Sequence, residues 1–378
     1  MNILQVIPYF NPKFGGDVNV CYNISKELAK KGHHVTILTT KFKFDKSYAD
    51  SISDVNIVAL DCYFNILFFL YSPSMKRWLK NNIKDFDVIH LHTFRSYQNN
   101  IIHNYSKKFS IPYVVQAHGS MPEKSQKQNL KKLYDKIWGE NILFGASKLV
   151  ALNKTELSQY KKMGANADKI EIIPNGINLS KCKTACEEMS FRNKYGINDN
   201  EKIILYVGRL HKTKGLDLLI DAFGDVVKNL DDVKLVFVGP DDGYKSSLKS
   251  SIEALDLEEK VVFTGFISRE EKIETYVDAD VFVTPNFSGF PITFLEACAS
   301  GTPIITTNKG DDLDWIHDNV GYVVDYDKDQ LFYAINRILS GQSLRKNFDN
   351  KCKKLVKEKF VWNEVVKNIE DLYMSCLS

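Results

Sequence analysis

Cationic side chains, glycines and a carboxylate stand in two short segments at spacings that suit the binding of an anion. The first segment, 206–215, reads YVGRLHKTKG, and Gly208 and Arg209 directly follow the apolar run 203–207. Open α/β sheets bind ligands at the carboxyl ends of their strands, so Arg209 and Lys214 indicate a diphosphate site. A departing diphosphate gains negative charge, which fixed cations stabilise more in the transition state than before it. Ion pairing at the surface is the alternative interpretation.

The second segment, 287–305, reads FSGFPITFLEACASGTPII and combines a turn with the start of a helix. Proline suits the first turn of a helix, and the free backbone N–H groups there face an anion favourably. Glu296 lies one turn further on, where a carboxylate suits the hydroxyls of a ribose. The turn and the helix start consist of Gly289, Phe290, Pro291, Ile292 and Thr293.

In this order the two segments resemble the retaining GT-B glycosyltransferases, a nucleotide-sugar family with the pattern Gly-Arg, Lys-Gly and then Glu-x7-Glu. The second glutamate matches Glu296, but Ser288 stands where the first is expected. Serine keeps a hydrogen-bonding group and loses the charge, which bears on the contact to the donor sugar rather than on the nucleotide site. The resemblance implies an α/β protein with two Rossmann-like domains that face each other across a deep cleft. It also implies a C-terminal helix that crosses back to the N-terminal domain.

Two further positions lie beside predicted elements of the N-terminal half. Gly15 and Gly16 precede a helix that is predicted to start near Asp17, and glycine lets a ligand approach the backbone closely. An ordinary turn is the alternative. His118 follows the predicted strand 113–117, although a lone histidine is also compatible with a structural role. The resemblance implies that the glycine pair approaches the diphosphate and the sugar, and that His118 contacts the donor sugar without acting as a nucleophile.

The resemblance also concerns the nucleotide base and the hinge. It places the base near the loop after the run 261–263, where Phe266 and Ile267 offer backbone contacts that serve uracil, guanine or adenine. UDP is expected from its frequency in the family. Asn175 and Gly176 match the hinge motif of the family, with an ordinary turn as the alternative.

Apolar runs alternate with amphipathic helical patterns in two successive series, which is typical of parallel sheets with helices on both faces. We expect an N-terminal acceptor-side domain, an interdomain connection, a C-terminal nucleotide-sugar-binding domain and a helical segment that packs back on the first domain. These parts correspond to residues 1–175, 176–200, 201–343 and 344–378. Strands are predicted at 3–8, 35–40, 88–92, 113–117, 149–153 and 170–174, and again at 203–207, 234–238, 261–263, 281–285, 304–307 and 322–324.

The composition suits an enzyme of two domains, with 378 residues and a net charge of +3. No apolar run approaches the roughly 20 residues that span a bilayer, and no signal peptide is recognised, so a cytoplasmic location is expected. The seven cysteines lack CxxC or Cys/His spacing, which predicts reduced thiols with neither a disulfide nor a zinc site. The acidic pairs at 278/280 and 312/314 are assigned to a solvated helix end and, with Asp311, to a helix cap. No metal or other cofactor is expected.

The charge is divided unevenly along the chain. Residues 1–175 contain 24 Lys and Arg against 14 Asp and Glu, a net charge of +10, and residues 176–378 contain 26 against 33, a net charge of −7. A lysine-rich amphipathic helix is predicted over 124–138, and residues 64–78 are rich in aromatic side chains. Together they indicate a peripheral contact with an anionic membrane surface, with packing on the domain itself as the alternative. Nucleic acid is not an expected partner because no recognition motif is present.

The expected function is a retaining, metal-independent transfer of a sugar, of the hexosyltransferase class, from a nucleoside diphosphate sugar to a hydroxyl acceptor. A lipid-linked or surface-polysaccharide glycan is the expected acceptor. Two alternatives remain open. A nucleotide-sugar epimerase shares the fold but needs carboxylates around the sugar, and a protein that binds a nucleotide sugar without turnover would account for Ser288. The expected catalytic residues are His118, Arg209, Lys214 and Glu296.

Overall fold

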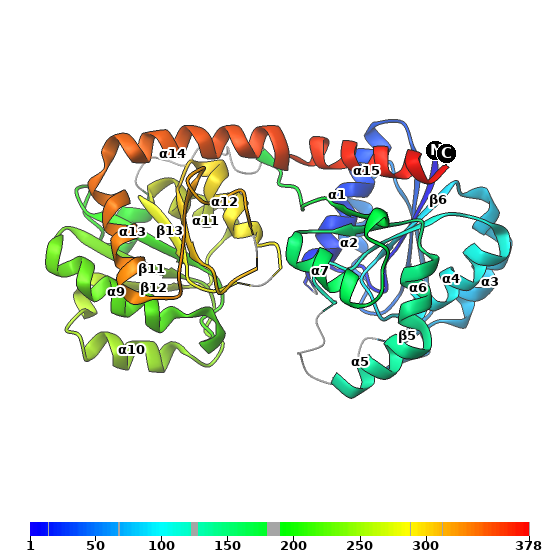
Figure 1. Ribbon diagram of the computed structural model, residues 1–378, viewed down its shortest axis with the longest axis horizontal. Coiled ribbons are helices and arrows are strands. Elements are labelled where there is room, and N and C mark those ends of the chain that lie inside the picture. Colours follow the sequence, from blue (N-terminus) through cyan, green and yellow to red (C-terminus); the bar gives the residue numbers. More distant parts are fainter. Residues whose placement is uncertain are drawn as a thin grey trace. The chain divides into compact units, whose positions relative to one another are not determined.

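The computed structural model describes residues 1–377 except Phe14, 67–68, 122–127, 180–189, Ser288 and Asp312. These residues form two compact units, drawn in Figure 1: unit 1 comprises Met1–Gly176 and Trp362–Ser378, and unit 2 comprises Ile177–Val361. Each unit contains one parallel sheet with helices on both of its faces. The predicted α/β class with two Rossmann-like domains is therefore confirmed.

Unit 1 is built on a sheet of seven parallel strands in the order β3-β2-β1-β6-β7-β8-β9. The chain first adds strands on one side of β1 and then on the other, so the topological switch point lies between β1 and β6. The strands are β1 (Asn2–Val6), β2 (His34–Thr40), β3 (Asn56–Leu60), β6 (Val88–His92), β7 (Tyr113–Gln116), β8 (Lys148–Ala151) and β9 (Ile170–Ile172), with a separate hairpin of β4 (Phe64–Ile66) and β5 (Phe69–Tyr71). The α-helices are α1 (Gly16–Lys30), α2 (Lys46–Asp50), α3 (Pro73–Asn82), α4 (Tyr97–Phe109), α5 (Gln128–Tyr134), α6 (Glu140–Gly145), α7 (Lys154–Lys162) and α15 (Trp362–Leu377), and a π-helical turn, η2 (Asp135–Gly139), joins α5 to α6.

Unit 2 repeats this plan with six parallel strands in the order β12-β11-β10-β13-β14-β15, and its switch point lies between β10 and β13. The strands are β10 (Lys202–Val207), β11 (Val233–Val238), β12 (Val261–Gly265), β13 (Val281–Thr284), β14 (Ile304–Thr307) and β15 (Gly321–Val324). The helical elements are α8 (Ser190–Tyr195), η5 (Lys212–Lys214), α9 (Leu216–Asn229), α10 (Lys245–Glu253), η6 (Glu258–Lys260), α11 (Arg269–Asp278), α12 (Ile292–Ser300), α13 (Lys328–Ser340), α14 (Gln342–Leu355) and η7 (Val356–Phe360).

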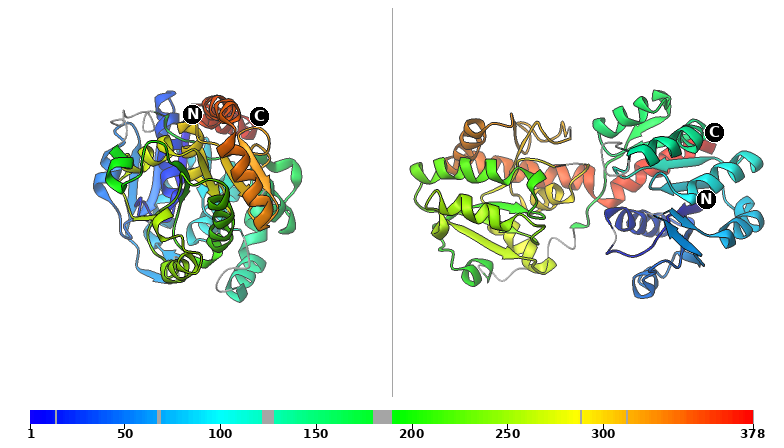
Figure 2. Two further views of the ribbon diagram at one scale, coloured as in Figure 1. Left: turned by 90° about the vertical axis from the view of Figure 1, so that its left-hand side faces the viewer. Right: turned by 90° about the horizontal axis from the view of Figure 1, so that it is seen from below.

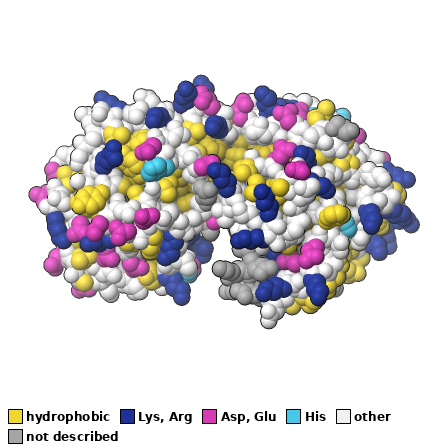
Figure 3. Space-filling model, viewed as in Figure 1, with side chains coloured by type: hydrophobic (Ala, Val, Ile, Leu, Met, Phe, Trp, Pro, Cys, Tyr) yellow, Lys and Arg dark blue, Asp and Glu magenta, His cyan; other side chains and the backbone are white. Residues whose placement is uncertain are grey.

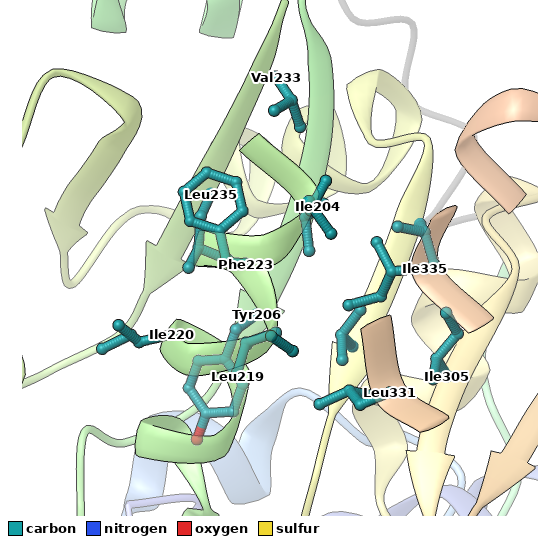
Figure 4. Close-up of a cluster of buried hydrophobic side chains, with 14 of the residues drawn as sticks. Ile204, Tyr206, Leu219, Ile220, Phe223, Val233, Leu235, Ile305, Leu331 and Ile335 are labelled. Carbon is teal, nitrogen blue, oxygen red and sulfur yellow. The ribbon is translucent and has the colours of Figure 1, made fainter. Parts of the chain in front are cut away.

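Both faces of the unit 2 sheet are buried against helices, which explains why its strands carry consecutive apolar residues. Ile204 and Tyr206 of β10 belong to one hydrophobic cluster, and Ile203 and Leu205 belong to another. Figure 4 shows the first cluster, in which side chains of β10 and β11 meet those of α9 and α13. Because apolar side chains fill most of both faces, charged groups that could meet a ligand lie where the strands end.

The start of α9 depends on a glycine at the end of the loop that follows β10. Gly215 has φ of 71°, a left-handed conformation that glycine adopts without a steric penalty. The chain turns there from Lys214 into a helix whose buried side chains recur at three- and four-residue spacings. This stripe consists of Leu216, Leu219, Ile220, Phe223 and Val226.

The last helix of the chain, α15, belongs to unit 1. It packs against α1, and the views of Figure 2 show the two helices, red and blue, alongside each other. Its buried side chains join the cluster that covers one face of the sheet. They are Trp362, Val365, Val366, Ile369, Leu372 and Tyr373.

The structure differs from the predicted organisation at three places. Of the segment 344–378 that was expected to pack on the N-terminal domain, residues up to Val361 belong to unit 2 and only those from Trp362 belong to unit 1. Residues 177–179 and 190–200 of the predicted connection belong to unit 2, with Phe191 buried in its core, while residues 180–189 lie outside the described part. The strand β3 was not predicted, because it lies at the sheet edge and its side chains are only half-buried.

The chain passes between the units twice, at Gly176/Ile177 and at Val361/Trp362. On the unit 2 side, Ile177 pairs with Val361 in a parallel bridge. On the unit 1 side, a Cβ atom at Gly176 would lie 2.6 Å from Cδ2 of Trp362. The glycine of the Asn-Gly pair is therefore required by the packing of the indole ring.

We expect Gly176→Ala to lower the stability of the protein by about 1–3 kcal/mol, the usual effect of overpacking a buried site. Gly224→Ala is the matched control, because a Cβ at Gly224, inside α9, would meet its nearest atom at 3.6 Å and alanine favours a helix. Thermal and urea unfolding of both variants measure the effect. An unchanged unfolding midpoint for Gly176→Ala contradicts the packing argument.

Candidate active site

In unit 2 the loops that follow β10 and β13 flank the switch point, which is where open parallel sheets bind their ligands. The two loops are tied together, since the side-chain amide of Asn286 donates a hydrogen bond of 2.7 Å to the carbonyl oxygen of Thr213. The loop after β10 carries Arg209 and Lys214, and the loop after β13 leads into α12. The topology thus brings the two predicted segments to the same edge of the sheet.

The two cations of this edge differ in their surroundings. Arg209 is exposed and pairs with Asp242 at 2.5 Å, an ion pair that is worth little where water screens it. Lys214 is half-buried and forms no ion pair with a described carboxylate. Burial, together with the nearby charge of Arg209, lowers the pKa of the Lys214 ammonium. An anion placed beside both cations would offset the repulsion between them and the cost of burying the Lys214 charge.

Close backbone approach holds the Arg209 loop against the loop after β11. A Cβ atom at Gly208 would lie 2.7 Å from the hydroxyl oxygen of Tyr206, so only glycine fits there. That hydroxyl donates a hydrogen bond of 3.0 Å to the carbonyl oxygen of Arg209. Leu210 N–H donates to the carbonyl of Pro240 at 2.9 Å. The position of the Arg209 backbone is therefore set by two neighbouring strands.

The start of α12 is partly engaged by the protein itself. Gly289 has φ of 75°, and its N–H donates to the carboxylate of Asp311. The sequence predicted free N–H groups at this helix start, but the N–H of Gly289 already has a partner. The described residues 313–327 contain no helix, so the expectation that Asp311 caps one is wrong, and Asp312 lies outside the described residues. Pro291 directly precedes the helix, which begins at Ile292. Burial raises the pKa of the Asp311 carboxyl, although the bond from Gly289 N–H partly offsets this.

Glu296 lies one turn into α12 and contacts α11. Its carboxylate pairs with the Lys272 ammonium at 2.8 Å and accepts a hydrogen bond of 3.2 Å from the Tyr276 hydroxyl. A carboxylate offers about four acceptor positions, so two such bonds leave capacity for the hydroxyls of a ribose. The structure places Glu296 beside a cation that the sequence analysis did not identify.

The remaining predicted donor-binding residues of unit 2 divide between the core and the surface. The Phe290 ring is half-buried against Trp315 and Phe360, with ring centroids 6.3 and 5.8 Å away. Ile267 is partly buried against the hydrophobic cluster that contains Ile203 and Leu205 of β10, whereas Phe266 is 85% exposed. Ile292 is exposed and Thr293 half-buried, and Ser288 lies outside the described residues.

In unit 1 the glycine pair and His118 follow two strands near the other switch point. The helix α1 begins at Gly16 and has no side-chain cap, and a Cβ at Gly16 would meet no atom within 4 Å. Asp17 stands in the first turn and accepts a hydrogen bond of 2.8 Å from Tyr9. The Asp17 carboxylate also acts on His118, since its charge opposes the lowering of the His118 pKa by burial, which sets the value at about 4.

His118 is held in a strained backbone conformation with φ of 52°. The buried Glu156 carboxylate accepts the N–H of the next residue, Gly119, at 2.7 Å, and the N–H of Leu152 at 2.7 Å. Arg95 donates to the carbonyl of Ser120 at 2.7 Å. These contacts fix the turn after β7 and with it the imidazole.

The described residues contain no group of three or more His, Cys, Asp or Glu side chains arranged to hold a metal ion. Cys21, Cys298, Cys352 and Cys376 are free thiols, and two further cysteines, Cys182 and Cys186, lie outside the described residues. Among the helices that are described, none is long and apolar enough to span a membrane.

Comparison with known proteins decides the family. Residues 188–355 match the family "Glycosyl transferases group 1", and residues 14–181 match "Glycosyltransferase Family 4". The chain belongs to these glycosyltransferases. It is 27% identical to an uncharacterised glycosyltransferase of Methanocaldococcus jannaschii, over 99% of this chain and 98% of that protein. It is 30% identical to the alpha-monoglucosyldiacylglycerol synthase of Streptococcus pneumoniae, over 79% of this chain and 68% of that protein.

A solved structure supports the fold independently. The crystal structure of Anabaena HepE in complex with UDP has a TM-score of 0.79 to this chain at 18% identity, and the match covers 99% of this chain and all of the other. The protein is thus a glycosyltransferase of the GT-B fold. Asp242 and Lys272, which contact Arg209 and Glu296 from a separate loop and helix, belong to no local motif and were not predicted, and Asp311 was predicted only as a helix cap.

The histidines of unit 1 generate a prediction on stability. Burial lowers the pKa of His90 from 6.5 to about 3, so the folded protein resists protonation that the unfolded chain accepts. The stabilising contribution of neutral His90 is complete above pH 6.5 and is lost as the pH falls. By pH 5 the free energy of unfolding has decreased by about 2 kcal/mol. We expect His90→Asn to flatten the decline in unfolding free energy between pH 7.5 and 5. The exposed His34→Asn serves as the control, and equal pH slopes for His90→Asn and wild type contradict the assignment.

Proposed function

We propose that this glycosyltransferase is retaining and metal-independent and transfers a hexose from a UDP-sugar to a hydroxyl acceptor in glycolipid or surface-polysaccharide synthesis. The observation that carries the proposal is the pair of cations at the switch point of unit 2. Lys214 stands there half-buried beside Arg209, without an ion pair to any carboxylate in the described part of the chain. Two such groups offset the charge of a diphosphate, which is the task that a metal ion performs elsewhere.

The proposed reaction needs no nucleophile from the protein. The acceptor oxygen forms a bond to the anomeric carbon on the face from which the diphosphate departs, and the bond between that carbon and the phosphate oxygen breaks. The acceptor proton passes to the departing phosphate, and UDP carries away the electron pair of the broken bond. Arg209 and Lys214 stabilise the charge that develops on UDP, whereas Glu296 binds the ribose.

UDP is proposed as the nucleotide because Anabaena HepE, which shares the fold, was solved with UDP bound. We expect UDP to raise the unfolding temperature more than GDP or ADP, since a ligand at 100 times its dissociation constant stabilises a protein by about 2.7 kcal/mol. Arg209→Gln and Lys214→Gln should each weaken UDP binding by about 10-fold to 100-fold, as expected for a hydrogen bond to a charged group. Asp242→Asn should strengthen it, by up to about fivefold, because it releases Arg209 from its ion pair.

Lys228→Gln is the matched control for these variants. Lys228 lies in the last turn of α9, which starts at the ligand-binding edge and runs to the opposite edge of the sheet. Its loss removes the same charge and should leave UDP affinity unchanged. A stronger thermal shift with GDP than with UDP would contradict the choice of base, and equal losses for Lys228→Gln and Lys214→Gln would show a general charge effect.

The stereochemical part of the proposal is tested by NMR of the anomeric proton during turnover of a UDP-hexose. Retention is the expected result, and inversion removes the retaining assignment. The same donor incubated without acceptor tests the epimerase alternative, which requires formation of a C2 epimer. Ser288→Glu tests the alternative of a binding protein, since recovery of transfer activity in this variant identifies a weakened enzyme.

An acceptor at an anionic membrane surface is proposed from the region 128–145 of unit 1. Large apolar side chains are exposed along α5, η2 and α6, although such residues are normally buried. Lysines lie between them, and Figure 3 shows hydrophobic and basic side chains close together in this part of unit 1. The apolar residues are Leu130, Leu133, Ile137, Trp138 and Phe144, and the lysines are Lys131, Lys132 and Lys136.

We expect the protein to co-sediment with vesicles that contain anionic lipid and less with neutral vesicles. Binding to the anionic vesicles should be weaker at 1 M than at 0.1 M salt, because the Debye length decreases from about 10 Å to about 3 Å. Changing Lys131, Lys132 and Lys136 to Gln should reduce binding at least tenfold, since each lysine near such a surface contributes about 1 kcal/mol. The control changes Lys107, Lys161 and Lys162, exposed lysines of α4 and α7, to Gln. Equal, negligible binding to both lipids would indicate a soluble acceptor.

A further inference from the structure

A continuous series of buried polar contacts connects the last helix of the chain to His118. The Gln5 amide nitrogen donates to the Tyr373 hydroxyl at 3.1 Å, and the Gln5 amide oxygen lies 2.7 Å from Nε2 of His92. Nδ1 of His92 lies 2.9 Å from Nε2 of His118. Tyr373 also lies 2.6 Å from Nδ1 of His90. Gln5, His90, His92 and Tyr373 are fully buried, and the three imidazole rings stack in succession.

This series assigns a proton to one nitrogen of each ring. Burial keeps His92 and His118 neutral at pH 7, so each ring has one donor and one acceptor nitrogen. The Gln5 oxygen can only accept, hence Nε2 of His92 carries the proton and its Nδ1 is an acceptor. Nε2 of His118 must then be the donor between the two rings. The remaining nitrogen of His118, Nδ1, is left as an acceptor.

That acceptor has no partner within the described protein. Nδ1 of His118 is buried and forms no hydrogen bond to a described residue. A buried polar atom without a partner is costly, and a water molecule or a ligand that donates a hydrogen bond would remove this cost. A phosphate oxygen carries only lone pairs at neutral pH and cannot satisfy an acceptor nitrogen, whereas a sugar hydroxyl can donate to it.

We propose that Gln5, His92 and Tyr373 are positioning residues that fix His118 in the Nε2–H tautomer, so that its Nδ1 accepts a hydrogen bond from a hydroxyl of the transferred sugar. The assignment of the hydroxyl to the sugar rests on the proposed glycosyl transfer, whereas the tautomer is a property of the protein alone. The last helix thereby takes part in recognition of the sugar although Tyr373 does not touch it.

The position of Tyr373 is itself well determined. It belongs to the buried face of α15, which packs against α1, and the preceding turn of the helix is anchored by Glu370. The Glu370 carboxylate pairs with Lys31 at 2.8 Å and with His33 at 2.7 Å. A helix that is held at both its apolar face and its polar edge can present one hydroxyl to Gln5 with little freedom.

The tautomer is measured directly by ¹⁵N NMR of the histidine side chains in the wild-type protein without ligand. We expect the Nε2–H form for both His118 and His92. The Nδ1–H form at His118 overturns the proposal, because it corresponds to a Gln5 amide turned the other way. This measurement requires neither a substrate nor a variant, so its failure is distinct from a failure of the proposed function.

Tyr373→Phe tests the role of the last helix. Without the hydroxyl the Gln5 amide loses the acceptor that orients it, so we expect a mixture of tautomers at His118. The affinity for the UDP-sugar should fall about fivefold to tenfold, the usual loss for one hydrogen bond. The affinity for UDP, which lacks the sugar, should stay unchanged. A pure Nε2–H form in this variant would overturn the role of Tyr373.

Tyr113→Phe is the matched control. It also removes a buried hydroxyl from unit 1, one that donates to the carbonyl of Ile142 at 2.6 Å and lies outside the series of contacts to His118. We expect it to leave the tautomer of His118 and the ratio of UDP-sugar to UDP affinity at the wild-type values. A change of that ratio as large as in Tyr373→Phe would show a general effect of lost packing and overturn the proposal.

Discussion

Burial of both faces of each parallel sheet is the constraint on which the chemistry of this protein depends. Strands such as β10 have apolar side chains on both faces, because helices cover the two sides. Polar groups that are open to a ligand are then found mainly where strands end, and the carboxyl ends of parallel strands all meet at one edge. Arg209 follows β10 and His118 follows β7 for this reason.

This constraint explains how much could be predicted. Strand runs, the α/β class and the cations after β10 are local signals, readable from a few consecutive residues. The pairing of Lys272 with Glu296 is not local, because it depends on how two helices pack side by side. The contact of Gln5 with Tyr373 joins residues 368 positions apart, and neither residue belongs to a motif. Such contacts follow from the three-dimensional packing alone.

The edge strand β3 was not predicted from the sequence although its pairing is local and regular. Burial on two faces produces the apolar runs by which strands are recognised, and an edge strand is covered less completely. Its sequence therefore carries a weaker signal although it pairs regularly with β2. The C-terminal segment 344–378 was predicted as one part because both of its helical stretches have apolar stripes, whereas the structure divides it between the two units. The chain returns to unit 1 at Trp362, where the indole ring packs against Gly176, and no local sequence signal marks this contact.

The distribution of charge indicates how an anionic donor is bound. Residues 176–378 have a net charge of −7, so the overall field of this half of the chain opposes the approach of a diphosphate. In the proposed function, attraction must then come from the few cations at the switch point of unit 2, and it acts at short range because salt screens charges beyond about 10 Å. Lys214 meets this requirement, since its partial burial removes the water that would weaken its interaction with an anion. Selectivity for a diphosphate over other anions therefore depends on the geometry of the edge rather than on the net charge of the chain.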